Sequence, residues 1–313
     1  MSQEPAAASD QWTVDRLLKW TTEYLDRNGL DEPRLSAELL LSHALGCAKI
    51  DLYARHDRVA DDEQRSRLRA LVRRAADHEP IAYLVGRKEF YSLSFEVTPD
   101  VLIPRPETEM IVERMIGLCR SLETGQVTFL DVGTGSGCIA IAVLSQVKAA
   151  RAVGSDVSSA ALAVAGRNAE AHGVLDRLTL VEADRLDLPA DCVPAGGFDV
   201  IVSNPPYVAE GDLTSLAENV RKYEPHTALF AGPDGLAFYR SLHDSAAGLL
   251  KSGGSVLVEI GAGIGDAVRR VMEDGERFEH AGTWHDAADP HDRVMQFILR
   301  SGSGPAAGGP TGA

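Results

Sequence analysis

From residue 127 onward, short apolar segments alternate with helical patterns, and this alternation constrains the fold more than any other feature. Short runs of β-branched and apolar residues are typical of buried strands. Strands that alternate with helices predict an α/β domain whose parallel sheet is covered on both faces. We expect strands at 127–132, 151–156, 178–183, 198–203, 254–260 and 294–300, a weaker strand near 277–283, and helices that include Ser158–His172 and Gly235–Leu250.

Before this region, apolar residues recur at helical spacing from Val14 to Leu25, from Pro33 to Leu45 and from Leu68 to Ala75. These patterns predict a small helical domain. The third pattern carries arginines that are typical of a solvated face but would also suit an anionic partner, namely Arg65, Arg67, Arg69, Arg73 and Arg74. The predicted organisation is a flexible tail at 1–10, a helical domain at 11–80, a β-hairpin connector at 81–105, the α/β domain at 106–300 and a disordered tail at 301–313.

Within the connector, residues 90–97 have the pattern of a hairpin. Residues 104–106 form a rigid Pro-Arg-Pro turn, and Pro106 suits the first position of a helix that continues to about Leu122. Two carboxylates fall in the first turn of that helix, where they interact favourably with its dipole: Glu107 and Glu109.

The predicted strand at 198–203 is followed by an unusual polar loop, Asn204-Pro205-Pro206-Tyr207. The two prolines remove two backbone donors and stiffen the loop. The Asn204 side-chain oxygen and the Pro205 carbonyl can accept the two hydrogens of a flat N–H₂ group, and Tyr207 can cover its face. The alternative is a proline turn that only ends a strand.

The other predicted strand ends carry the residues of a cofactor site. Residues 131–137 read Asp-Val-Gly-Thr-Gly-Ser-Gly, a spacing that lets the backbone turn sharply beside a ligand. A dinucleotide fingerprint would require Gly or Ala where the chain has Cys138, and a phosphate loop would end in Gly-Lys-Ser/Thr. Asp156 can bind two ribose hydroxyls and Asp184 an adenine amine. Alone, Asp156 would be read as a helix cap, but the array fits S-adenosylmethionine better than a pyrophosphate cofactor.

The glycine loop, Asp156 and the Asn-Pro-Pro-Tyr sequence resemble those of class I S-adenosylmethionine-dependent methyltransferases. The sequences EPIAYLVGRKEF at 79–90 and VLIPRPETE at 101–109 narrow the resemblance to the HemK/PrmC family, over about residues 12–300. The resemblance implies a helical N-terminal domain, a hairpin connector and a Rossmann-like domain with a seven-stranded sheet. On this basis we expect the helical domain at 11–80 to be a substrate-recognition domain. It also implies methylation of the side-chain amide nitrogen (N5) of the glutamine in the Gly-Gly-Gln motif of class 1 peptide chain release factors, with S-adenosylhomocysteine as the product of the cofactor.

The same resemblance assigns the substrate glutamine to residues 204–207, with Asn204, Pro205 and Tyr207 as the catalytic candidates. Family members can carry an aromatic residue that stacks on adenine where this chain has Arg185, whose guanidinium can also stack. The candidate cofactor residues are Gly133, Thr134, Gly135, Ser136, Gly137, Asp156, Asp184, Arg185 and Asn204. The expected chemistry is in-line methyl transfer assisted by positioning rather than by a general base.

Composition excludes several other classes. The net charge of −15 disfavours non-specific binding of nucleic acid, so no direct nucleic-acid partner is expected. The four cysteines are far apart and form no C-x-x-C pair, which together with the lack of a signal sequence or apolar span predicts a reduced, cytoplasmic protein without membrane contact. One polar cluster superficially resembles a metal site, but its spacing favours a solvated loop without metal: His285, Asp286, Asp289, His291 and Asp292.

Three alternatives stay open on the sequence. A glutamine methyltransferase that acts on a ribosomal protein would share the Asn-Pro-Pro-Tyr loop, although the sequence at 104–109 favours the release-factor branch. An N6-adenine DNA methyltransferase would share a similar loop, but it would need a basic groove. A non-catalytic binding module would keep the fold and bind S-adenosylmethionine without turnover.

Overall fold

The computed structural model describes residues 11–122, 126–285 and 291–301. The predicted tail at 1–10 and all of the predicted tail at 301–313 except residue 301 lie outside the described residues. The chain divides into two compact units. The first comprises the chain up to Gly86 together with residues 217–223, and the second comprises 87–216 and the chain from Glu224 onward.

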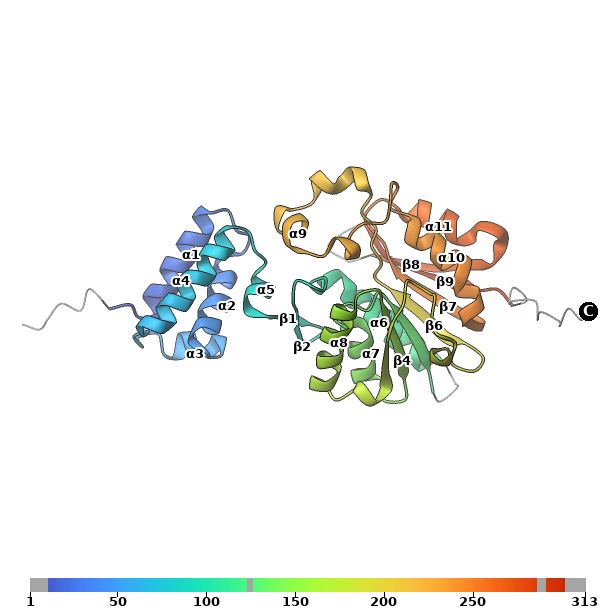
Figure 1. The fold of residues 1–313 in the computed structure, drawn as a ribbon, viewed down its shortest axis with the longest axis horizontal. Coiled ribbons are helices and arrows are strands. Elements are labelled where there is room, and N and C mark those ends of the chain that lie inside the picture. Colours follow the sequence, from blue (N-terminus) through green and yellow to red (C-terminus); the bar gives the residue numbers. More distant parts are fainter. Residues whose placement is uncertain (1–10, 123–125, 286–290, 302–313) are drawn as a thin grey trace, which may run out of the picture. The chain divides into compact units, whose positions relative to one another are not determined.

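The first unit is helical, with α1 (Val14–Arg27), α2 (Pro33–Leu45), α3 (Lys49–Ala54), α4 (Asp62–Ala76), α5 (Ile81–Val85) and the separate α9 (Glu218–Tyr223) (Figure 1). The three predicted helical patterns are α1, α2 and α4, whereas α3 and α5 were not predicted. A capping box begins α4, because the Asp61 carboxylate accepts from the Gln64 N–H at 2.8 Å and the Gln64 side chain accepts in return at 3.2 Å. The Tyr223 hydroxyl of α9 donates to the Asp77 carbonyl at 3.0 Å.

Three arginines of α4 form ion pairs within this unit. Arg67 contacts Glu63 at 3.2 Å, Arg74 contacts Glu79 at 2.5 Å, and Arg65 contacts Asp62. These carboxylates compensate part of the positive charge, as expected for a solvated face.

The second unit contains a seven-stranded sheet in the order β5-β4-β3-β6-β7-β9-β8 (Figure 1). Its strands are β3 (Thr128–Val132), β4 (Arg151–Asp156), β5 (Leu178–Glu182), β6 (Phe198–Ser203), β7 (Leu250–Glu259), β8 (Phe278–His285) and β9 (Asp292–Leu299). The strands from β5 to β7 are parallel, as predicted. The prediction is wrong for β9, which runs antiparallel to both β7 and β8. Only residues 286–291 join β8 to β9, and so short a connection cannot make a parallel crossover.

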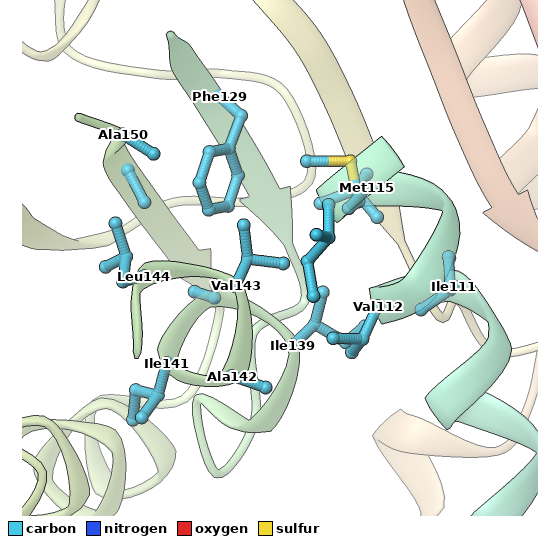
Figure 2. Packing of buried hydrophobic residues seen from close by; sticks show 14 of the residues in the cluster. Ile111, Val112, Met115, Phe129, Ile139, Ile141, Ala142, Val143, Leu144 and Ala150 are labelled. Carbon is cyan, nitrogen blue, oxygen red and sulfur yellow. The ribbon is translucent and has the colours of Figure 1, made fainter. Parts of the chain in front are cut away.

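Helices cover both faces of this sheet, which confirms the predicted α/β class. On β6, Val200 and Val202 belong to one buried cluster and Ile201 to the other, because successive side chains of a strand point to opposite faces. Figure 2 shows part of the first cluster, which includes Met115, Phe129 and Val143. The helices of this unit are α6 (Glu109–Ser121), α7 (Cys138–Gln146), α8 (Ser159–Ala171), α10 (Ala237–Leu249) and α11 (Gly265–Glu273).

The predicted hairpin is present in the second unit as β1 (Arg87–Phe90) and β2 (Leu93–Glu96). Its turn is fastened by the Tyr91 N–H, which donates to the Glu109 carboxylate at 2.8 Å. The helix predicted to begin at Pro106 starts as a 3-10 turn, η1 (Pro106–Thr108), and becomes α-helical at Glu109. Glu109 therefore holds the hairpin in addition to lying at a helix N-terminus.

Candidate active site

A cavity of about 450 Å³ lies in the second unit, where the parallel strands end. Its walls include residues that directly follow β3, β4, β5 and β6, which is the usual ligand position in such sheets. Most of the candidate residues line this cavity, namely Gly133, Thr134, Gly135, Ser136, Asp156, Asp184, Arg185, Asn204 and Pro206. Gly137, Pro205 and Tyr207 are not among the lining residues.

The glycine loop is folded back onto the neighbouring strand. The N–H groups of Gly133 and Thr134 both donate to the Ser155 carbonyl, at 2.8 and 2.9 Å. Gly137 has a positive φ of 81°, and a Cβ there would lie 2.7 Å from Ile141 Cδ1. Gly137 therefore allows α7 to start tightly packed, and its contact with a cofactor stays a prediction.

Asp156 connects this loop to the next strand. One carboxylate oxygen accepts from the Gly135 N–H and the other from the Ser158 N–H, each at 2.9 Å. A carboxylate oxygen has two lone pairs, so both oxygens keep acceptor capacity toward the cavity. Asp156 thus accepts a hydrogen bond just before α8, as the helix-cap interpretation expects, and it also lines the cavity. Its geometry fits two ribose hydroxyls.

The next strand end presents an exposed pair. The Asp184 side chain is 74% exposed, and its carboxylate lies 3.8 Å from the Arg185 Nε. Arg185 has a φ of 56°, a left-handed backbone that turns the chain at the cavity wall. Because both side chains are exposed and, among the described residues, have only each other as a close charged partner, either can turn toward a ligand without breaking a buried ion pair.

Asp131 was part of the predicted loop but was not singled out as a functional residue. It is fully buried behind the loop, and one oxygen accepts from Thr134 Oγ1 at 2.8 Å and from the Ala140 N–H at 3.2 Å. Its Oδ1 has no hydrogen-bond partner among the described residues. Burial raises the pKa of Asp131 to about 7, against the lowering effect of the two hydrogen bonds. The Oδ1 of Asp131 is therefore an unused buried acceptor beneath the glycine loop, and Asp131 is not one of the residues that line the cavity.

Asn204 is held by residues that the sequence did not reveal. Its Nδ2 donates to Thr108 Oγ1 at 3.0 Å, and Thr108 Oγ1 donates to Glu259 Oε2 at 2.7 Å. Thr108 and Glu259 are 1% and 3% exposed. Burial raises the pKa of Glu259 to about 7. The sequence signal that could have identified Glu259 is its position as a carboxylate that directly ends an apolar strand, as Asp156 does.

Tyr207 packs beneath the loop rather than in the cavity wall. A Cβ on Gly261 would lie 2.8 Å from the Tyr207 ring, so only glycine admits the ring so closely. Burial raises the pKa of the Tyr207 phenol, which therefore stays neutral. The Tyr207 ring supports the loop, and its covering of a substrate stays a prediction.

Arg105 adds a positive side chain to the cavity wall. Its guanidinium contacts Glu224 at 2.5 Å, and the same carboxylate accepts from the Ile103 N–H at 3.2 Å. The Glu224 side chain is fully buried, so this ion pair fixes the Pro-Arg-Pro turn against the cavity. Neither residue was predicted as part of the site.

Among the residues that the structure describes, no His, Cys, Asp and Glu side chains gather as a metal site would require. Asp286 and Asp289 of the predicted non-metal cluster lie outside the described residues. In the same described part of the chain, no helix has the length and apolar character needed to span a membrane.

The chain is similar to known proteins over nearly its whole length. Residues 16–86 match the family model for the PrmC N-terminal domain, and residues 115–222 match that for the methyltransferase small domain. The release factor glutamine methyltransferase of Rhodopirellula baltica is 39% identical over 288 residues, which are 91% of this chain and 96% of the relative. That of Geobacter sulfurreducens is 44% identical over 259 residues, which are 82% of this chain and 87% of the relative.

A solved structure supports the fold alone. The hMettl16 catalytic domain, solved in complex with a MAT2A 3'UTR hairpin, is 15% identical and aligns with a TM-score of 0.53 over 78% of this chain and 84% of that one. The extended matches to curated relatives go further than the fold, because they cover both units at high identity. The chain belongs to the release factor glutamine methyltransferase family.

Proposed function

We propose that this protein transfers a methyl group from S-adenosylmethionine to the side-chain amide nitrogen (N5) of the glutamine in the Gly-Gly-Gln motif of class 1 peptide chain release factors. The observation that carries the proposal is the fixed side-chain amide of Asn204 at the wall of the cavity formed by the glycine loop and Asp156. Because release factors act in translation termination, we place the reaction in the cytoplasm.

The cofactor half of the proposed site comprises the loop from Gly133 to Ser136, Asp156, Asp184 and Arg185. S-adenosylmethionine supplies an electrophilic methyl group on a positively charged sulfur. The Asp156 oxygens retain lone pairs for ribose hydroxyls. The acidic loop and strand end are also favourable surroundings for a cation.

The substrate half explains how a poor nucleophile becomes reactive. The lone pair of an amide nitrogen is delocalised into its carbonyl group. Asn204 Oδ1 and the Pro205 carbonyl can accept the two N–H groups of the substrate amide, which orients the nitrogen and stabilises positive charge that develops on it. The S–CH₃ bond breaks as the N–CH₃ bond forms, S-adenosylhomocysteine leaves, and the nitrogen loses one proton to water.

The test is a methylation assay with labelled S-adenosylmethionine and a purified, unmodified release factor, followed by peptide mass spectrometry. We expect one methyl group on the Gly-Gly-Gln glutamine with wild-type protein. We expect none with Asn204→Ala, whose affinity for S-adenosylhomocysteine should be retained. Asp212→Ala, an exposed carboxylate outside the cavity wall, is the matched control and should act like wild type.

Three results would contradict the proposal. Label on a ribosomal protein but not on the release factor would identify the ribosomal protein as the substrate. Label on adenine would place the activity among nucleic-acid methyltransferases. Binding of S-adenosylmethionine without any product would leave a non-catalytic module.

A further inference from the structure

We propose that Thr108 and Glu259 are positioning residues that determine which end of the Asn204 side-chain amide faces the substrate. This inference rests on the proposed function. It concerns a buried chain of hydrogen bonds from Asn204 through Thr108 to Glu259, two links of which come from outside the Asn-Pro-Pro-Tyr loop.

The three residues meet because of the sheet. Ser203 of β6 pairs with Val258 of β7, so Asn204 and Glu259 are neighbours at the same end of two parallel strands. Thr108 is brought to them by the 3-10 turn that precedes α6. The separations along the sequence are 96 residues for the first hydrogen bond and 151 for the second, so only the tertiary fold assembles this chain.

Thr108 is the last residue of the 3-10 turn that leads into α6, and its backbone is already helical, with a φ of −68° and a ψ of −17°. Its hydroxyl makes no capping hydrogen bond to the helix and is directed to Glu259 and Asn204. A buried hydroxyl whose hydrogen bonds belong to a polar chain that ends at a residue of the cavity wall points to a role in the site.

The donors and acceptors of this chain of hydrogen bonds determine which group donates at each step. An ionised carboxylate can only accept hydrogen bonds, so the single Thr108 proton goes to Glu259. The Thr108 oxygen must then accept, and only the Nδ2 end of Asn204 can donate to it. The Oδ1 end is thereby left as the acceptor for the substrate amide. With the Asn204 amide reversed, its N–H groups would oppose those of the glutamine.

The direction of these hydrogen bonds depends on the charge of Glu259. Once protonated, Glu259 can donate to Thr108, whose proton is then free to turn toward an Asn204 oxygen. Because the pKa of Glu259 is raised to about 7, this change falls near neutral pH, with the fixed direction present above that pH and lost below it. The titratable or charged groups that interact with Glu259 come from several elements. They are Arg105, Glu107, Cys138 of α7, Tyr207, Tyr239 and Arg293.

The matched variants are Thr108→Val, which removes the hydroxyl at nearly constant volume, and Thr108→Ser, which keeps it. We expect Thr108→Val to lower kcat roughly 100-fold with little change in KM for the release factor, because the amide loses its productive orientation. Thr108→Ser should restore most of kcat. Affinity for S-adenosylhomocysteine, measured by calorimetry, should be similar in all three proteins and reports that the cavity is intact.

A second readout uses pH. The wild-type kcat should fall as the pH is lowered through about 7, whereas Glu259→Gln should have a low kcat without that step, because a glutamine amide has no proton to gain in this range. In the same titration, the side-chain amide resonances of Asn204 in the NMR spectrum should shift with pH in wild type and not in Glu259→Gln.

The two levels of the proposal fail in different ways. Equal kcat for Thr108→Val and Thr108→Ser would overturn the role of Thr108 while leaving the proposed function in place. A pH step and amide shift that persist in Glu259→Gln would overturn the role of Glu259. Wild-type protein that leaves the release factor unmethylated would overturn the proposed function and, with it, this inference.

Discussion

The buried carboxyl of Asp131 makes a quantitative prediction about stability. Its pKa is raised from 3.8 in an unfolded chain to about 7 in the folded protein, because burial disfavours the charged form. A carboxyl with a raised pKa favours the folded state at low pH, and this stabilisation disappears as the pH rises through the folded pKa. The folded protein therefore loses stability from this residue between about pH 4 and 7.

The size of this stability loss follows from the part of the Asp131 pKa shift that lies between pH 5 and pH 8. Between pH 5 and pH 8 about two pKa units are crossed, and at 1.36 kcal/mol each the loss is about 2.7 kcal/mol. For a domain of this size, such a loss lowers Tm by roughly 5–10 °C. In Asp131→Asn the residue no longer titrates, so this part of the pH dependence should be missing.

The assay is urea unfolding of the cofactor-free protein at pH 5, 6, 7 and 8, with the free energy of unfolding compared between wild type and Asp131→Asn. Asp184→Asn is the matched control, since it makes the same substitution at a carboxylate that is 74% exposed, and it should keep the wild-type pH dependence. If Asp131→Asn follows the wild-type curve in parallel, Asp131 is not a buried carboxyl with a raised pKa, and the reasoning is refuted.

Three further substitutions test the geometry of the site. Gly137→Ala should destabilise the protein by roughly 1–3 kcal/mol, because its Cβ would meet Ile141 at 2.7 Å, and Tm should fall accordingly. Arg105→Ala should cost roughly 3 kcal/mol in urea unfolding because it strands the buried Glu224 carboxylate, and adding Glu224→Gln should recover part of it. Without that recovery, the ion pair is not what Arg105 contributes. Asp156→Ala should weaken S-adenosylmethionine binding roughly 10- to 100-fold by calorimetry, and unchanged affinity would remove Asp156 from the cofactor site.

The strands and the glycine loop were predictable because their signals are local. A buried strand shows as a short apolar run, and each predicted strand has its counterpart in the sheet. The direction of β9 was not predictable from its own residues, because direction depends on the length of the connection from β8. The hydroxyl of Thr108 was also hidden, since its partners lie 96 and 151 residues away along the chain.

In the candidate site too, residues with a local sequence signal were predictable and those that depend on distant partners were not. Asn204 and Asp156 stand at the ends of local patterns and were found from the sequence, and both line the cavity. Tyr207 belongs to the same motif but packs against Gly261, so membership of a motif did not predict which side chains face the cavity. Glu224 carried no signal, because an acidic residue before a proline resembles any surface loop until its burial is known.

The inclusion of residues 217–223 in the first unit makes that unit discontinuous in the chain. The polypeptide enters it twice, so cutting the gene after Gly86 would separate Tyr223 from its partner Asp77 and would not yield the complete unit. The residue that follows this segment is Glu224, which holds Arg105 at the cavity wall. A single peptide bond thus joins the last residue of the helical unit to Glu224, the partner of Arg105 at the cavity wall.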